Sequence, residues 1–506
     1  MSGSSITLAE ARKPSQGFLA PLLVGLVAFL VYRATLAPGL TWAHTGTDGG
    51  DLVTAAMVWG VPHPPGYPTY TFLGHLFSRL PLGSVAFNLN VMSAVCAALA
   101  AALIAASVLR GAETLRRSAA QGDKTKLRDS FAAVIAGLTL GFGPMLWGQA
   151  IIAEVHALNA LFVSAICFLA PPWVVELRVS GPIEKIALGL VWGVSLGNTP
   201  TMVALAPIVL PAVWRGARGR WIGFAALLAG LSVYALIPIR AATLPPISWF
   251  DARSLQNFVR LVSGELYRGY VFAAPSDLVF QRILGLPRLW LEQVGWVGAI
   301  WIAWGVVALF RWKRIAPVTL CAVMYVVFAI GYNTIDSDLY LIPVWVLSAG
   351  YLGVGLIAAL DSHRVGRGLI GAAAALGALV MLVGNWRALD VSRERSATDF
   401  AERALSRALP EAILITHADA HTFTLWYYRL AEGRRPDVSI VDARLASYDW
   451  YGLMLVAQDA TLRLPDDRGT ADLADRLLVA NPARPVCEVA ESTGELTCQS
   501  PDATGD

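Results

Sequence analysis

The chain has 506 residues, of which 56% are hydrophobic and only 15% are charged, and its formal net charge is +3. Soluble globular proteins carry about 25% charged residues, so this composition excludes an ordinary soluble enzyme and indicates an integral membrane protein. The small net charge gives no reason to expect a nucleic-acid partner.

Eleven apolar segments approach the length that a membrane span requires. A spanning helix needs about 20 apolar residues, because the hydrocarbon core of a bilayer is about 30 Å thick. The predicted spans are 17–37, 84–109, 130–147, 154–174, 185–198, 200–214, 221–239, 290–310, 315–332, 339–360 and 369–386. Residues 185–214 form either two short tilted spans or one broken hairpin, because Asn198, Thr199 and Pro200 interrupt them. The sequence thus predicts an all-α polytopic membrane protein.

Basic residues are distributed unequally between the loops. Cytoplasmic loops are enriched in Lys and Arg. If the N-terminus, with Arg12 and Lys13, is cytoplasmic, every second loop lies on that side and carries the basic residues. Their basic residues are Arg110, Arg116, Arg117, Lys124, Lys126, Arg128, Arg178, Lys185, Arg215, Arg218, Arg220, Arg311, Lys313, Arg314, Arg364 and Arg367. An odd number of spans then places residues 387–506 outside, and we expect the first span to be retained rather than cleaved.

The C-terminal part has the composition of a small soluble domain. Two apolar runs, 412–416 and 437–441, read as buried strands between helical stretches at 396–409, 420–431 and 447–458, which predicts an α/β domain. Cys487 and Cys498 bracket a predicted hairpin and are either disulfide-bonded or unpaired. The predicted organisation is therefore a transmembrane domain, 1–386, with long outer loops at 38–83 and 240–289, and an extracytoplasmic domain, 387–506.

Two carboxylates lie close together in the first outer loop, in Thr47-Asp-Gly-Gly-Asp51. Asp48 is the preferred candidate for a general base, which must lie within hydrogen-bonding reach of the proton that it removes. Asp51 is either a second acidic group of the same site or the cap of a helix that begins at Leu52. In the same loop, His63-Pro-Pro-Gly-Tyr-Pro68 cannot lie inside a helix and forms either a structural turn or part of a site.

Other polar residues collect at the same face of the membrane. Arg240 ends a predicted span, where it binds either a phosphate group or lipid headgroups. Glu154 either orients a sugar hydroxyl or forms an ion pair with Arg240. Asp336 and Asp338 lie in a short loop and either bind a metal or remain solvated. No Cys/His spacing predicts a metal site.

Several segments together resemble the transmembrane protein 260 family of O-mannosyltransferases and its bacterial relatives. The first are Thr47-Asp-Gly-Gly-Asp-Leu52 and His63-Pro-Pro-Gly-Tyr-Pro68. The others are 149–159, 193–198, 238–242, 247–249, 422–428 and 433–438. The chain departs from the family at Asp51, where a glutamate after Ser-Gly is usual, at His156, where relatives often have tyrosine, and after Asn198, where relatives often have histidine.

The resemblance implies a GT-C fold and an inverting transfer of a sugar, most simply mannose, from a polyprenyl-phosphate lipid to a protein or glycan acceptor. It implies that Asp48 is the base and that Arg240 holds the departing phosphate. The implied substrate contacts are His63, Tyr67, Glu154, His156, Asn198, Arg240, Trp249, Asp336 and Asp338. We expect no cofactor or metal, and a location in a bacterial plasma membrane with a cytoplasmic N-terminus.

Three other functions compete with this prediction. A transporter or flippase needs polar residues near the midplane of several spans, whereas here they gather at one face. An outer-face glycan ligase would share that face but would use a diphosphate-linked polymer as donor. A non-catalytic envelope protein would act without Asp48.

Overall fold

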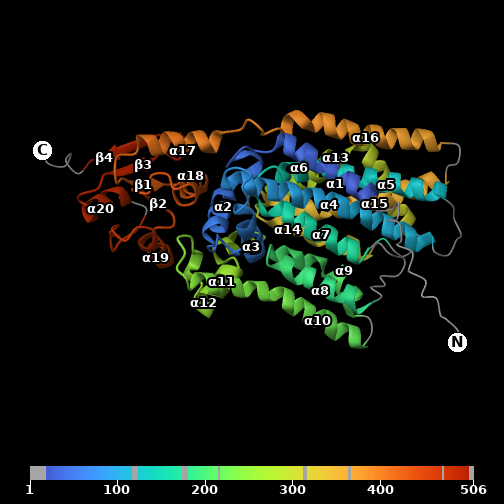
Figure 1. Ribbon diagram of the computed structural model, residues 1–506, viewed down its shortest axis with the longest axis horizontal. Coiled ribbons are helices and arrows are strands. Elements are labelled where there is room, and N and C mark those ends of the chain that lie inside the picture. Colours follow the sequence, from blue (N-terminus) through green and yellow to red (C-terminus); the bar gives the residue numbers. More distant parts are fainter. Residues whose placement is uncertain are drawn as a thin grey trace, which may run out of the picture.

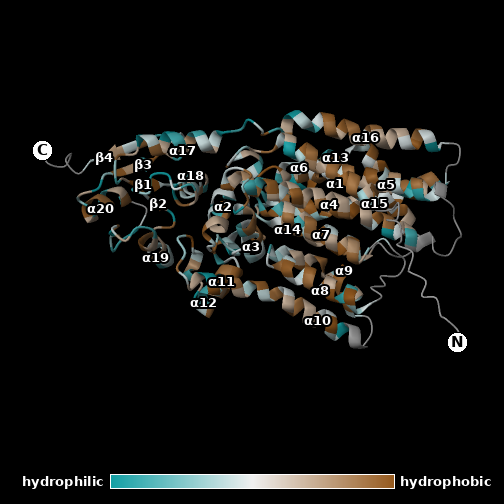
Figure 2. Ribbon diagram, viewed as in Figure 1, coloured by the Kyte–Doolittle hydropathy of each residue, from teal (hydrophilic) through white to brown (hydrophobic). Residues whose placement is uncertain are grey.

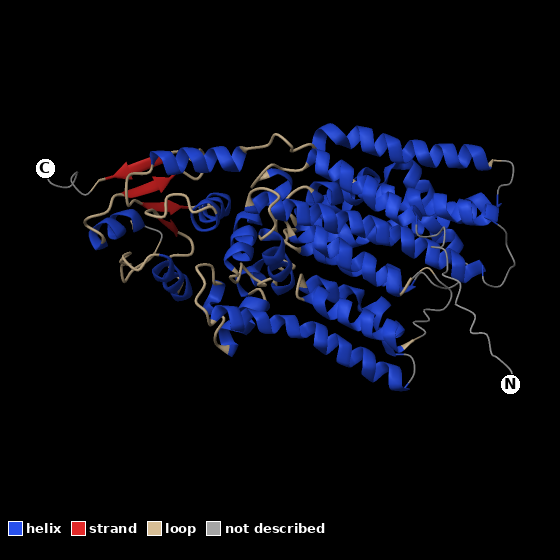
Figure 3. Ribbon diagram, in the orientation of Figure 1, coloured by secondary structure: helices blue, strands red, loops and turns tan. Residues whose placement is uncertain are grey.

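The computed structural model describes residues 19–116, 123–171, 173, 181–214, 217–310, 316–362, 366–469 and 472–500. A bundle of long helices forms one end of the molecule, and the part with strands forms the other (Figure 1, Figure 3). Half of the predicted cytoplasmic basic residues, including Arg12, Lys13, Arg178 and Lys313, lie outside the described residues.

The bundle consists of twelve helices within the described ranges. They are α1 (Leu19–Thr35), α4 (Val85–Arg116), α5 (Asp123–Phe142), α6 (Pro144–Ala150), α7 (Val155–Leu169), α8 (Pro182–Leu196), α9 (Ala206–Trp214), α10 (Ala217–Leu231), α13 (Ser276–Phe310), α14 (Ala316–Gly331), α15 (Ile342–Ser362) and α16 (Arg367–Leu389). Helices α4 and α15 are mostly buried, whereas α16 exposes Leu369, Leu376 and Val383. Large apolar side chains exposed along a helix are typical of a lipid-facing surface.

Five stretches of the described chain are long and apolar enough to cross a membrane, and a sixth is the pair α5 and α6, which is bent by 67°. The shorter apolar helices are Leu19–Thr35, Val155–Leu169, Pro200–Trp214 and Ala316–Gly331. The chain is thus a helical membrane protein, as predicted, and the count of eleven spans stays a prediction. Figure 2 shows the apolar residues concentrated in this bundle. Residues 185–214 contain two helical segments, joined through Gly197, Asn198 and Thr199.

Short helices cover the end of the bundle that faces the strands. From the first outer loop come η2 (Ala43–Asp48), α2 (Gly49–Val58) and α3 (Pro68–Ser78). The others are η3 (Pro200–Leu205), η4 (Ser232–Ala235), α11 (Leu236–Ala241), η5 (Trp249–Asp251), α12 (Leu255–Val262), η6 (Glu265–Tyr270) and η7 (Ser337–Leu341). Val61 pairs with Ser248 in an isolated bridge, which joins the two long outer loops.

The C-terminal part contains the small sheet that the sequence predicts, in the order β2-β1-β3-β4. Strands β1 (Ile413–Thr416), β2 (Ser439–Asp442) and β3 (Val486–Val489) are parallel, and β4 (Leu496–Gln499) returns antiparallel to β3. The helices are α17 (Ser396–Arg407), α18 (Asp419–Trp426), the π-helical turn η8 (Tyr427–Ala431), α19 (Asp449–Gln458) and α20 (Leu473–Ala480). A disulfide joins Cys487 in β3 to Cys498 in β4.

Helix α18 packs directly on the first outer loop. A Cβ atom added to Gly50 would lie 2.4 Å from the backbone oxygen of Phe423, so only glycine permits this approach. Trp42 donates through its indole nitrogen to the hydroxyl of Thr424, 3.0 Å away. The C-terminal part is therefore in contact with the segment that carries Asp48 and Asp51.

Candidate active site

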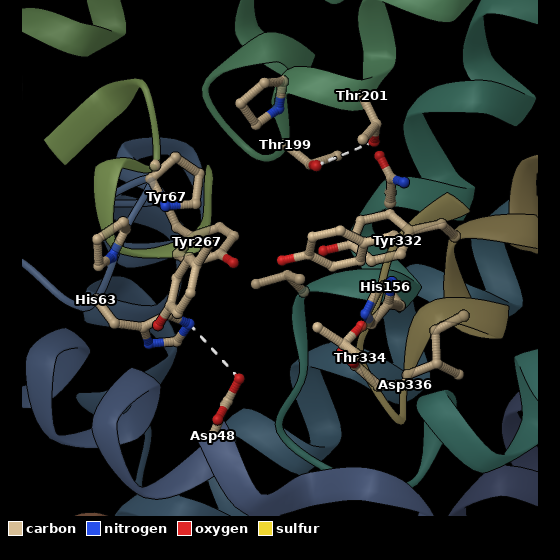
Figure 4. Close-up of a pocket in the computed structure, with 18 of the residues that line it drawn as sticks. Asp48, His63, Tyr67, His156, Thr199, Thr201, Tyr267, Tyr332, Thr334 and Asp336 are labelled. Carbon is tan, nitrogen blue, oxygen red and sulfur yellow. Dashed lines mark hydrogen bonds and ion pairs between the residues drawn. The ribbon is translucent and has the colours of Figure 1, made fainter. Parts of the chain in front are cut away.

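A cavity of about 410 Å³ lies where the outer loops, the bundle and α18 meet. Its wall comes from segments that are far apart in the sequence: the first outer loop, the start of α7, η3, the α12–η6 segment, the α14–η7 loop and Asp419. Of the predicted site residues, the lining includes Glu154. It also includes Asp48, His63, Tyr67, His156 and Asp336, which are labelled in Figure 4. The structure thus brings together residues that the sequence places in four separate segments.

Asp48 presents its carboxylate to this cavity. It precedes α2 in the capping position, but its side chain makes no capping hydrogen bond, and 43% of the side-chain surface remains accessible. Its Oδ2 lies 3.6 Å from Nε2 of His63. The carboxylate is therefore available to a molecule that enters the cavity.

Asp51 has a different role from either of those that the sequence suggests. It lies within the first turn of α2, and its buried carboxylate accepts hydrogen bonds from the backbone nitrogen of His63 at 2.9 Å and from the indole of Trp249 at 3.1 Å. It also lies 2.7 Å from Nδ1 of His63. Asp51 is thus not the cap of a helix beginning at Leu52. It is a positioning residue that orients His63, as Trp249 in turn holds Asp51.

Backbone strain is concentrated in the same loop. His44, Thr45, Trp59 and Tyr67 all have left-handed backbone conformations, with φ of 53°, 62°, 50° and 37°. Such conformations cost non-glycine residues about 1–2 kcal/mol each and often accompany functional sites. The proline-rich turn is closed by a hydrogen bond from the nitrogen of Gly66 to the oxygen of His63, 2.9 Å long. His63 therefore belongs both to a structural turn and to the candidate site, the two alternatives that the sequence left open.

The electrostatics of the cavity favour a histidine that is charged. Burial alone would lower the pKa of His63, but the carboxylates of Asp48 and Asp51 outweigh it and raise that pKa to about 9. Burial raises the pKa of Asp48 to about 6, with Asp419 and Asp336 adding to the effect and His63 opposing it. A carboxylate with a raised pKa is a stronger base than an ordinary aspartate and is still ionised near neutral pH.

Aromatic rings and hydroxyl groups form the rest of the wall. Tyr67 and Tyr267 face the side of His63, and Tyr332 and His156 lie opposite (Figure 4). Burial raises the pKa of both Tyr67 and Tyr267 well above the usual value, so their hydroxyl groups remain protonated donors. Flat apolar faces next to hydroxyl groups suit a sugar ring, which is apolar on its faces and polar on its rim.

Glu154 is buried beside the cavity without a cationic partner among the described residues. Its Oε2 accepts from the backbone nitrogen of Val155 at 3.3 Å, and its Oε1 has no hydrogen-bond partner. The predicted alternative of an ion pair with Arg240 is therefore wrong. Buried polar atoms are nearly always hydrogen-bonded, so the free oxygen indicates a place for a donor group of a ligand.

Arg240 does not line the cavity, which corrects its predicted role. Its Nε donates to the backbone oxygen of Trp59 at 2.9 Å, and its guanidinium lies over the Trp59 ring, 4.8 Å from the centroid. These contacts hold the C-terminal end of α2 to α11. The arginine of the cavity wall is Arg268 in η6, which the sequence reading missed.

Arg268 is held but not neutralised. Its Nη2 donates to the hydroxyl of Ser263 at 2.6 Å, and it forms no ion pair with a carboxylate within the described ranges. The sequence signal was weak, because Arg268 lies in the middle of a long loop that also contains Arg253 and Arg260. Those two pair with Asp251 and Glu265, respectively.

Three further predicted substrate contacts lie outside the lining. Asn198 is buried and donates to the backbone oxygen of Val155, 3.2 Å away, so it holds η3 near α7. Trp249 contacts Asp51 instead of the cavity. Asp338 is exposed and lies two residues after Asp336. Among the described residues, no three His, Cys, Asp or Glu side chains gather in a way that could hold a metal ion.

Two family models match the chain in order. The protein O-mannosyl-transferase TMEM260 N-terminal domain matches residues 48–235, and TMEM260-associated domain 2 matches residues 397–458. The protein O-mannosyl-transferase TMEM260 of Mus musculus is 26% identical over 468 residues, which cover 84% of this chain and 63% of that protein. The Dictyostelium discoideum relative is 24% identical, with 85% and 58% covered. The chain thus spans about three fifths of the length of these relatives.

Solved structures share the fold. ArnT from Cupriavidus metallidurans bound to undecaprenyl phosphate gives a TM-score of 0.56 at 14% identity, with 86% of this chain and 91% of that chain covered. The same protein in the apo state gives 0.52 at 16% identity, with 85% and 90% covered. The chain therefore shares its fold with ArnT, and two of its segments match models of the TMEM260 family.

Proposed function

We propose that this protein is a membrane glycosyltransferase that moves mannose from a polyprenyl-phosphate lipid to an acceptor hydroxyl. The observation that carries the proposal is the cavity itself, in which the accessible carboxylate of Asp48 and the guanidinium of Arg268 line one space. The names of the relatives support mannose as the sugar, and the lipid phosphate bound to ArnT supports the class of donor.

The proposed reaction is a single displacement. Asp48 accepts the proton of the acceptor hydroxyl while that oxygen forms a bond to the anomeric carbon of the sugar. The bond from that carbon to the phosphate oxygen breaks, and its electron pair stays with the lipid phosphate. Arg268 binds the negative charge that develops on the phosphate, and the proton on Asp48 then passes to solvent.

The surrounding residues position the two partners. Asp51 and Trp249 hold His63, and the charged His63 lies against Asp48 at 3.6 Å. Glu154 accepts a hydrogen bond from a sugar hydroxyl through its unpartnered Oε1. We propose that no resident metal takes part, because Arg268 supplies the cation at the leaving group. We also propose that the N-terminus is cytoplasmic and that the cavity faces the other side of the membrane.

The test is transfer of labelled mannose from polyprenyl-phosphate-mannose by the purified full-length protein. A positioned general base contributes about 10²–10⁴-fold to rate, so Asp48→Asn is expected to lower transfer by at least about 100-fold. Asp338→Asn is the matched control, since Asp338 is an exposed aspartate outside the lining. Equal transfer by Asp48→Asn and the wild type would exclude this mechanism, as would a requirement for a diphosphate-linked donor.

A further inference from the structure

A second cavity, of about 550 Å³, lies in the C-terminal part of the chain. It is at the edge of the sheet where the parallel strands begin, and its lining includes Glu411, Asp437 and Arg484, each two residues before the start of β1, β2 or β3, respectively. Exposed residues such as Thr461 and Ala483 form part of its wall, so the cavity is open to solvent. None of its lining residues also lines the cavity that contains Asp48.

Arg429 is the unusual member of this second wall. It belongs to η8 and is only 8% exposed. Its Nη1 and Nη2 donate to the side chain and backbone oxygens of Gln458 at 3.3 Å, and its Nε has no hydrogen-bond partner. Buried charged groups are normally paired with an opposite charge, because removal from water is costly. Arg429 forms no such ion pair within the part of the chain that the structure describes.

The acids of this cavity are already engaged. Asp459 binds Arg484 at 2.8 Å and also accepts from Ser439 and Thr461. Asp437 binds Arg435 at 2.9 Å. Arg463, in contrast, is exposed at the rim, and no carboxylate among the described residues pairs with it. The wall therefore offers two guanidinium groups that form no ion pair with its acids, and Asp459 and Asp437 act on Arg429 only from a longer distance.

We propose that this cavity is a binding site for an oxyanion, either a phosphate or a sugar carboxylate, with Arg429 as its buried anchor and Arg463 at its mouth. The planar guanidinium donates two parallel hydrogen bonds to such a group, and Nε of Arg429 is a buried donor without a hydrogen-bond partner among the described residues. The site is separate from the proposed transfer reaction. Gln458, which contacts Arg429, also donates to the backbone oxygen of Pro246 at 2.6 Å, so the wall is joined to the second outer loop.

Calorimetric titration of the purified full-length protein at constant ionic strength tests this proposal, with inorganic phosphate in one arm and glucuronate in the other. The titrations use the Arg268→Gln background, because phosphate is also expected to bind Arg268 in the other cavity. Saturable binding of either anion is expected. Loss of a charge-assisted hydrogen bond costs about 1.5–3 kcal/mol, so adding Arg429→Met should weaken binding by about tenfold or more.

Arg463→Gln is the second variant and should also weaken binding. Because Arg463 is exposed, its substitution is expected to leave the fold intact. Arg407→Gln, an exposed arginine of α17 outside the cavity, is the matched control and should bind as the background does. Binding of phosphate alone or of glucuronate alone identifies the anion. The proposal is overturned if neither anion binds, or if the Arg429 and Arg463 variants bind as tightly as the Arg407 control.

Discussion

His63 lies between two carboxylates that differ in exposure, and this difference separates their roles. Asp51 is fully buried and bonded on all sides, whereas Asp48 keeps 43% of its side-chain surface accessible. A carboxylate whose oxygens already accept three hydrogen bonds is poorly placed to take a proton from a substrate. Asp48 is therefore the group that can act as a base, and Asp51 holds the histidine that lies against it.

The pKa shifts of this pair predict a bell-shaped dependence of transfer rate on pH. Asp48 must be ionised to act, so the rate should rise as pH increases through about 6. His63 must be charged to hold Asp48, so the rate should fall as pH increases through about 9. The Asp51→Asn variant removes one of the carboxylates that raise the pKa of His63, so its alkaline limb should move to lower pH. An unchanged alkaline limb in this variant would contradict the assignment to His63.

The two arginines give a second prediction at this scale. Arg268→Gln should lower transfer by about 10²–10³-fold, the effect of removing one donor to a developing oxyanion. Arg240→Gln is the comparison, because Arg240 contacts Trp59 and not the cavity, and its rate should fall far less. The measurement is single-turnover transfer from saturating donor. A larger loss of transfer rate in Arg240→Gln than in Arg268→Gln would indicate that the phosphate binds Arg240, as the sequence first suggested.

These residues show how far sequence reasoning reaches. In the first outer loop, the motif Thr47-Asp-Gly-Gly-Asp51 predicted Asp48, and the proline-rich segment after it predicted His63. Arg240 was chosen because it ends a span, yet its side chain contacts Trp59. Arg268 was missed because its place beside the cavity depends on where η6 lies in the fold. Residues 240–289 show no hydrophobic periodicity that predicts this position.

Helices α2 and α18 are the elements whose contact sets the geometry of the site. Phe423 of α18 stacks on His63, with ring centroids 6.3 Å apart and planes at 9°, while its backbone contacts Gly50. Asp419, at the start of α18, lines the cavity and is held by Arg444 at 2.5 Å. The C-terminal part therefore forms one wall of the site, in addition to containing the second cavity.

Gly50→Ala tests this contact. Its methyl group would lie 2.4 Å from the backbone oxygen of Phe423, so α2 must move away from α18 and carry Asp51 with it. Overpacking of this kind costs about 1–3 kcal/mol, and a displacement of about 1 Å near reacting groups can lower rate about 100-fold. Gly384→Ala, in exposed space on α16, is the control and should transfer normally. Normal transfer by both variants would show that the α2–α18 contact does not set the site.

Element types were predictable where periodicity was strong. The strands at 412–416 and 437–441 and the three helices around them are confirmed, because buried strands and amphipathic helices leave clear local patterns. The hairpin between Cys487 and Cys498 is also confirmed, as β3 and β4, but the pairing of β3 with β1 was not predicted because the two strands are far apart in the sequence. The sequence also gave no sign that α18 would pack against the first outer loop, because such contacts depend on the whole fold.

At the scale of the whole molecule, the bundle is mainly hydrophobic, whereas the end that carries the sheet mixes hydrophobic and hydrophilic residues (Figure 2). The cavity is lined by residues of both parts. A tag at the C-terminus should therefore be accessible to an impermeant reagent from the side of the membrane opposite the cytoplasm. The same reagent should reach an N-terminal tag only after the membrane is opened. Reversed accessibility would place the cavity on the cytoplasmic side and would contradict the proposed orientation.

The most direct measurement is a structure of the full-length protein with polyprenyl-phosphate-mannose bound, prepared with Asp48→Asn so that the donor persists. Density is expected for the phosphate beside Arg268 and for the sugar between Tyr67 and His156, with its anomeric carbon facing position 48. Density for the phosphate beside Arg240, or for the donor anywhere outside this cavity, would contradict the proposed mechanism.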